Sequence, residues 1–127
     1  MTLRKILLLV VGLMLGATLL FASAGDGAWM NKVPEKERGR QNPFDSEQNA
    51  IAAGAKLFRQ NCSSCHGDDA MGQSKHPSLH SEHIRAATPG QLEWILKNGS
   101  MKNGMPSWSK LPEQQRWQIV SFLKSLQ

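Results

Sequence analysis

The sequence predicts a small all-α domain, and three observations support this prediction. The chain has 127 residues, which is enough for one domain but not for two. Residues 46–60, 89–98 and 112–126 each carry apolar side chains at the three- and four-residue spacing of a helix. No stretch alternates between apolar and polar residues as a strand does, and no internal repeat is present. We therefore expect three main helices joined by loops.

The first 24 residues have the features of an export signal. Arg4 and Lys5 precede an apolar run over residues 6–21, and Ala-Ser-Ala at residues 22–24 is a small-residue cleavage site. We expect cleavage there and a periplasmic product; an uncleaved membrane anchor on the periplasmic face is the alternative. Cleavage removes two of the positive charges that give the chain its net charge of +5. The remainder has no dense Lys and Arg patch, which argues against nucleic-acid binding.

Residues 25–44 are interpreted as a linker between the signal and the domain. Glycine and proline interrupt this stretch, and its charges alternate without an apolar stripe. Trp29, Met30 and Val33 are the exceptions, and we expect them to dock loosely on the domain or on a partner. The domain itself is then residues 45–127.

The first helix of the domain is predicted over residues 46–60. Asp45 is in position to cap it, with Gln48 three residues later as in a capping box. Gly54 falls in the middle of this helix, where glycine is unfavourable unless another backbone comes close. We therefore expect a second helix to cross here, beside Phe58.

The other two helices have clear boundary signals. Thr88 is a good N-cap, and Gln91 stands three residues later at the second position of a capping box. Asn98-Gly99 is expected to end this helix. Pro112 begins the last helix, because proline suits the first turn, and Glu113 follows it at the positive end of the helix dipole.

Residues 62–66, Cys-Ser-Ser-Cys-His, have the Cys-x-x-Cys-His pattern by which a c-type haem is attached. Two thiols at this spacing each add to one vinyl group of a haem, and the histidine that follows presents a ring nitrogen to the iron. The chain has no other cysteines. We therefore expect one covalent haem c bound to Cys62 and Cys65, with His66 as an axial ligand of the iron.

Two other uses of a Cys-x-x-Cys pair compete with haem attachment. A thioredoxin-type redox site needs a βαβ context, and no run of β-branched residues precedes Cys62. A structural zinc site needs four ligands. Because the chain has no second cysteine pair, the ligands beyond Cys62 and Cys65 would have to come from His76, His80 and His83. Zinc binding is the alternative that remains.

Residues 67–87 are predicted to be a long loop, with one helical turn near residues 81–85. Turn-forming residues dominate it. A loop of this length in a small domain usually has a function or packs around a bound group. The face of a haem would be such a surface for the loop to cover.

The second axial position decides whether a haem carries electrons or binds an external ligand. The candidate ligands are Met71, Met101, Met105, His76, His80 and His83. Met71 is close to His66 in sequence, so it would reach the opposite face only through a very tight wrap. Met101 and Met105 lie between the last two helices, and Pro106 stiffens the backbone beside Met105. We predict Met105 as the ligand and Met101 as its substitute.

These motifs resemble those of the small bacterial class I cytochromes c. The resemblance rests on residues 62–67, 77–79 and 104–108, and it covers residues 45–127. It implies the class I cytochrome c fold, in which three main helices and their loops wrap around one haem. The crossing of the first and last helices in that family matches Gly54, Phe58, Ile119 and Phe122.

The resemblance also implies roles for two residues of the long loop. The carbonyl of Pro77 would accept a hydrogen bond from His66, and Leu79 would pack on the ring of the haem. His76 stands where the family usually has glycine. This difference affects the expected shape of the local turn and not the ligands of the iron.

The function implied is electron transfer without catalysis. With both axial positions filled, the protein would pass single electrons from a dehydrogenase or quinol-oxidising complex to a terminal oxidase or reductase of the periplasm. Contacts with these partners would be transient. We expect a monomer that binds no nucleic acid and touches a membrane only if residues 1–24 are retained. A haem-based ligand-binding or sensing protein, and the small cytochrome subunit of a dehydrogenase complex, are the alternatives.

Overall fold

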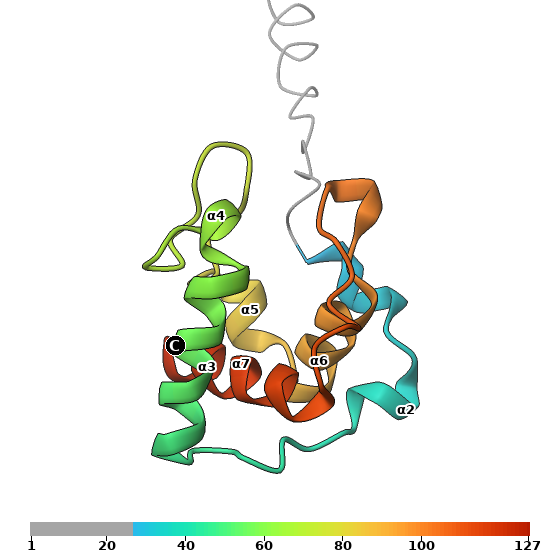
Figure 1. Cartoon of the computed structure of the whole chain (residues 1–127). Helices are drawn as coiled ribbons and strands as arrows, with labels where there is room; N and C mark the ends of the chain where they lie inside the picture. The colour runs from blue at the N-terminus through green and yellow to red at the C-terminus, as the bar shows by residue number, and fades with distance from the viewer. Residues whose placement is uncertain (1–26) are drawn as a thin grey trace, which may run out of the picture.

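The computed structural model describes residues 27–127, which form helices and loops with no β-strand among them. The elements are the 3-10 helix η1 (Ala28–Lys32), α2 (Glu35–Arg38), α3 (Gln48–Asn61), α4 (Ser63–His66), α5 (Glu82–Ala86), α6 (Pro89–Asn98), the 3-10 helix η2 (Met101–Asn103) and α7 (Glu113–Ser125). Figure 1 shows α3 and α4 on one side of the molecule and α6 with the η2 loop on the other. The prediction of an all-α domain with three main helices, α3, α6 and α7, is confirmed.

The predicted export signal, residues 1–24, lies outside the described residues. Within residues 27–127, no helix combines the length and the apolar character that a bilayer crossing requires.

The crossing of α3 and α7 is the centre of the fold. Gly54 of α3 lies against α7 so closely that a Cβ atom there would overlap the carbonyl oxygen of Gln118 and lie 3.0 Å from Cβ of Phe122. The rings of Phe58 and Phe122 are 5.2 Å apart between centroids. The predicted crossing at Gly54, beside Phe58, is therefore confirmed. Phe58 and Ile119 are each 1% exposed, so the core lies on this contact.

The boundaries of α6 follow the sequence signals. Thr88 Oγ1 accepts a hydrogen bond from the Gln91 backbone N–H at 3.1 Å, and Gln91 Oε1 accepts one from the Thr88 N–H at 2.8 Å. The predicted capping box is thus present in full. Gly99, with a φ of +70°, ends the helix after Asn98 as expected.

The predicted cap of α3 is wrong. The helix begins at Gln48, its N-cap is Glu47, and no side chain caps it. Ser46 has a φ of +62°, a left-handed turn that separates Asp45 from the first turn of the helix. The upstream chain is held instead by Asn42, whose Oδ1 accepts the Phe44 N–H at 3.0 Å.

Residues 27–44, which we call the arm, are packed on the domain instead of forming an open linker. Val33 is 2% exposed, and Trp29 and Met30 are half-buried against the core. The buried Asn42 side chain donates hydrogen bonds to the Trp117 carbonyl at 3.2 Å and to Ser121 Oγ at 2.8 Å. The expected docking of the apolar residues is therefore observed, and Asn42 attaches the segment to α7 at a second point.

A cluster of charges fastens the arm to α6 and α7. Glu93 of α6 is 1% exposed, and its carboxylate accepts a hydrogen bond from Arg116 Nε at 2.7 Å and one from Arg40 Nη1 at 3.3 Å. Arg40 also pairs with Glu113 and lies 5.1 Å from the ring centre of Trp117. Because desolvating a charge is costly, such a cluster holds together only when every member keeps a partner.

Candidate cofactor site

The end of α3 and the single turn of α4 bring both cysteines and His66 onto one short stretch. The Cys62 N–H donates to the Phe58 carbonyl at 2.7 Å, which carries the chain from the core directly to the motif. Both thiols are free and half-buried. Burial, and then the neighbouring Cys65, raise the pKa of the Cys62 thiol to about 11, so this thiol is protonated at neutral pH. Gly67, with a φ of +79°, turns the chain away after His66.

His66 is held by the carbonyl of Pro77. His66 Nδ1 lies 3.1 Å from the Pro77 oxygen. A carbonyl oxygen can only accept, so Nδ1 carries the proton of this hydrogen bond and Nε2 keeps a free lone pair. Burial lowers the pKa of His66, an effect that the Pro77 hydrogen bond opposes and nearby His76 reinforces. The imidazole is therefore neutral at neutral pH, which is the form that binds a metal ion.

The loop that contains Pro77 folds back on α4. The Gly72 N–H donates to the His66 carbonyl at 2.8 Å, and the Leu79 N–H donates to the Ala70 carbonyl at 2.8 Å. Gly72 has a φ of +83°, and a Cβ atom there would lie 2.7 Å from the His76 carbonyl oxygen. The loop thus needs glycine at this position to reach His66.

The histidines proposed for a zinc site do not assemble one. The rings of His76 and His66 are 6.4 Å apart between centroids, and His80 Nε2 interacts instead with the Asp69 carbonyl at 2.9 Å. Across residues 27–127, no group of three or more His, Cys, Asp and Glu side chains is arranged to hold a metal ion. The zinc alternative therefore lacks a ligand set in the described part of the chain.

Of the three methionine candidates for the second axial position, only Met105 is turned toward the core. Its side chain is half-buried against the core cluster, whereas Met101 is 73% and Met71 56% exposed. Two hydrogen bonds fix its backbone to Ser100, one at 2.8 Å and one at 3.1 Å. The loop is further held at Gly99, where a Cβ atom would lie 2.6 Å from the Pro106 carbonyl carbon.

Two of these supporting glycines, Gly72 and Gly99, were not given a role in the site by the sequence. Each lets one backbone segment pass directly over another, and in both cases φ is positive. Glycine in a loop is a signal for such contacts, but it does not say which segment comes close.

The residues present fit a covalently attached haem. Two thiols stand three positions apart, a neutral imidazole with a free Nε2 follows them, and a half-buried thioether lies in a second braced loop. Half-buried apolar side chains that a flat apolar group can cover pack on the same core, among them Leu79, Ile84, Met105 and Trp108. An all-α domain with this donor set is a c-type cytochrome with one haem.

Comparison with known proteins gives the family. Residues 49–123 match the family model described as cytochrome c oxidase, cbb3-type, subunit III, and the chain belongs to this family of cytochrome c domains. As a member it carries haem c, covalently bound, and its size is that of a single-haem domain.

Two relatives agree with this assignment. Cytochrome c550 of Pseudomonas aeruginosa is 29% identical over 93 residues, which cover 68% of this chain and 62% of that protein. The crystal structure of cytochrome CL from Methylophaga aminisulfidivorans MPT superimposes with a TM-score of 0.59 at 26% identity, covering 67% of this chain and 58% of that one. The chain thus spans about three fifths of the length of each relative. The class I cytochrome c fold expected from the sequence is confirmed.

Proposed function

We propose that this protein is an exported carrier of single electrons in which the haem is attached to Cys62 and Cys65 and has His66 and Met105 as axial ligands. The haem, when bound, supplies an iron that alternates between the ferrous and ferric states. In this role the protein makes and breaks no bond in a substrate.

The hydrogen bond between His66 Nδ1 and the Pro77 carbonyl carries the proposal. It fixes the tautomer, orients the ring and leaves Nε2 as the coordinating atom. A histidine that must hold an iron through repeated changes of charge gains from a partner of this kind, because the hydrogen bond also makes the ring a stronger ligand.

The way Met105 is held in its loop supports electron transfer as the function and argues against ligand sensing. Its backbone is held by two hydrogen bonds and its side chain lies against the core, which suits a thioether that stays on the iron. A neutral, soft sulfur ligand favours ferrous iron and raises the reduction potential. A sensing protein needs that position open or easily vacated.

The partners and the compartment are part of the same proposal. The signal-like residues 1–24 support export to the periplasm. The family description names a subunit of a terminal oxidase, which supports an acceptor of that kind and a dehydrogenase or quinol-oxidising complex as donor. We propose short-lived encounters of a monomer with both. Val33, Trp29 and Met30 pack on their own domain, which disfavours the alternative in which they dock a dehydrogenase.

The visible spectrum of the reduced, exported protein, before and after addition of carbon monoxide, tests the proposal. We expect a low-spin c-type spectrum that carbon monoxide leaves nearly unchanged. Met105→Ala should open the iron to carbon monoxide, and Met101→Ala, a change at the exposed methionine of the same loop, should not. A wild-type protein that binds carbon monoxide at once would replace electron transfer by sensing as the proposed function.

The attachment is tested separately. Cys62→Ala combined with Cys65→Ala should leave no haem on the polypeptide in a denaturing gel, whereas Met105→Ala should retain it. Haem that stays attached in the double cysteine variant would refute the assignment of these thiols.

A further inference from the structure

The C-terminal half of the arm lies directly on α6. A Cβ atom on Gly90 would overlap the carbonyl oxygen of Glu37, so the two backbones touch there. Beside this contact, Thr88 Oγ1 donates a hydrogen bond to the Arg38 carbonyl at 2.9 Å. Arg40 follows, in the charge cluster with Glu93 and Glu113. This half of the arm is therefore fastened independently of any cofactor.

The N-terminal half of the arm is seated on α5 through Gly27. This residue is buried and has a φ of +83°. A Cβ atom on it would lie 2.8 Å from Met30 Cε and 2.9 Å from His83 Nδ1. The backbone conformation therefore favours glycine, and a side chain here would have to displace Met30 Cε and the His83 ring. As a result the Met30 methyl group and the His83 ring both lie against Gly27.

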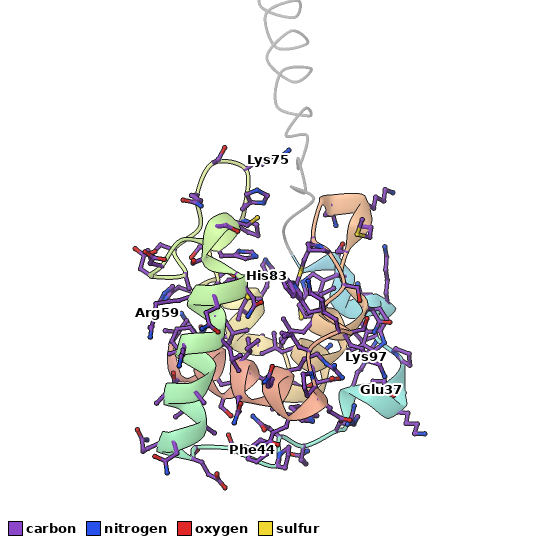
Figure 2. All side chains as sticks on the ribbon, viewed as in Figure 1. Glu37, Phe44, Arg59, Lys75, His83 and Lys97 are labelled. Atoms are coloured by element: carbon purple, nitrogen blue, oxygen red, sulfur yellow. The ribbon has the colours of Figure 1, made fainter. Side chains whose placement is uncertain are left out.

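This contact lies in the middle of the molecule, between the two sides that carry the site residues (Figure 2). Figure 2 shows His83 in the middle of the molecule, between the side formed by α3 and α4 and the side formed by η1 and α6. Trp29 and Met30 pack on the same core cluster as Leu79 and Met105, and like them they are only partly covered by protein. Apolar side chains that share one core and keep an open surface are suited to cover an apolar cofactor.

We propose that residues 27–33 form one wall of the haem site, with Met30 covering the cofactor from the α5 side and the Gly27–His83 contact holding that wall in place. The inference rests on the proposed haem site between His66 and Met105. Water stabilises the ferric state, which carries one more positive charge than the ferrous state, so a wall that excludes water raises the reduction potential. The same wall limits the entry of small ligands.

The role of Met30 in covering the cofactor is tested with Met30→Ser in the haem-loaded full chain. Met101→Ser, at an exposed methionine, is the control. We expect the Met30 variant to retain its haem and to shift to a lower reduction potential, with the control unchanged. In a Met105→Ala background, which opens the iron, Met30→Ser should also speed the combination with carbon monoxide several-fold. A wild-type potential together with an unchanged rate would overturn the proposal.

The Gly27–His83 contact, which we call the seat, is tested by comparing Gly27→Ala with Gly39→Ala. Both residues are glycines of the arm, but a Cβ atom on Gly39 meets nothing within 4 Å. We expect Gly27→Ala to lower the potential in the direction of Met30→Ser and to speed proteolytic cleavage within residues 27–33. Gly39→Ala should match the wild type in both. A Gly27 variant with the potential of the Gly39 variant would refute the role of the seat.

These tests separate the wall from the proposed function on which it rests. If Met105→Ala alone fails to open the iron, the axial assignment fails, and with it the proposed function. If Met105→Ala opens the iron but neither Met30→Ser nor Gly27→Ala changes the potential, the proposed function stands and the wall is refuted.

Discussion

Gly54 of α3 touches the carbonyl oxygen of Gln118 in α7, and this contact leaves no room for a side chain. The two helices can approach this closely only because one of them lacks a Cβ atom at the crossing. The distance between the helices therefore depends on Gly54 having a hydrogen atom where other residues have Cβ. The position of Cys62, at the C-terminal end of α3, depends on this distance.

Gly54→Ala is expected to destabilise the protein by about 1–2 kcal/mol. Overpacking at a fixed backbone costs about 1–3 kcal/mol, and the better helix propensity of alanine returns up to about 1 kcal/mol. Urea unfolding of the haem-loaded protein measures the change. Ala52→Gly, at an exposed position of the same helix, should cost about 1 kcal/mol through propensity alone. A Gly54→Ala protein as stable as the wild type would show that α3 and α7 can separate freely.

Thr88→Ala should lower the free energy of unfolding by about 1–2 kcal/mol. The substitution removes an N-cap hydrogen bond, worth about 1 kcal/mol, and the hydrogen bond to the Arg38 carbonyl. Asp45→Ala is the matched control, because the sequence predicts a cap there that the structure does not contain. It should change stability by less than about 0.5 kcal/mol. Equal losses in the two variants would contradict the assignment of the caps.

Arg116→Leu should be strongly destabilising, by about 3 kcal/mol, because it deprives the buried Glu93 carboxylate of its closest partner. Replacing both members, Arg116→Met with Glu93→Gln, should cost less than the single change, since no unpaired charge is then buried. Equilibrium unfolding of the two variants gives the comparison. A double variant less stable than the single one would mean that the ion pair itself contributes most of the stabilisation.

Glu113 should make the protein sensitive to acid. The hydrogen bond from Arg40, followed by that from Trp117, lowers the pKa of this carboxyl in the folded state. Its contribution to stability is complete above the ordinary carboxyl pKa of about 4.3 and is lost as the pH falls through the lowered pKa of the folded protein. The stability difference between wild type and Glu113→Gln should therefore shrink as the pH falls. Screening by solvent keeps it small, since the Glu113 side chain is 51% exposed. A difference independent of pH would rule out this linkage.

The features that could be predicted from the sequence are mostly those that depend on residues close together in the chain. The capping box at Thr88 and the helix end at Gly99 are both local patterns. The crossing at Gly54 was also predicted, because glycine in the middle of a helix is unfavourable unless a second backbone lies against it. The long loop, with its short helix α5, was placed within a residue of its observed position.

What could not be predicted depends on partners distant in the sequence. Arg40 pairs with Glu93 and Glu113, which are 53 and 73 positions away, so the stretch around it looked like a solvated linker. The failed cap at Asp45 has the same origin, because the upstream chain is held by Asn42 and its bonds to α7. In the site, the choice of Met105 over Met101 was suggested by Pro106, but their difference in exposure appears only in three dimensions.

The way the arm is fastened also determines how the domain responds to tension. A pull on the chain at Gly27 loads the contacts of the arm one after another, as when a strip is peeled, and not all together. The seat on His83 bears the load first, the contact between Arg38 and Thr88 next, and the Arg40 cluster last. Mechanical strain entering from this end therefore reaches α5 before it reaches the crossing of α3 and α7.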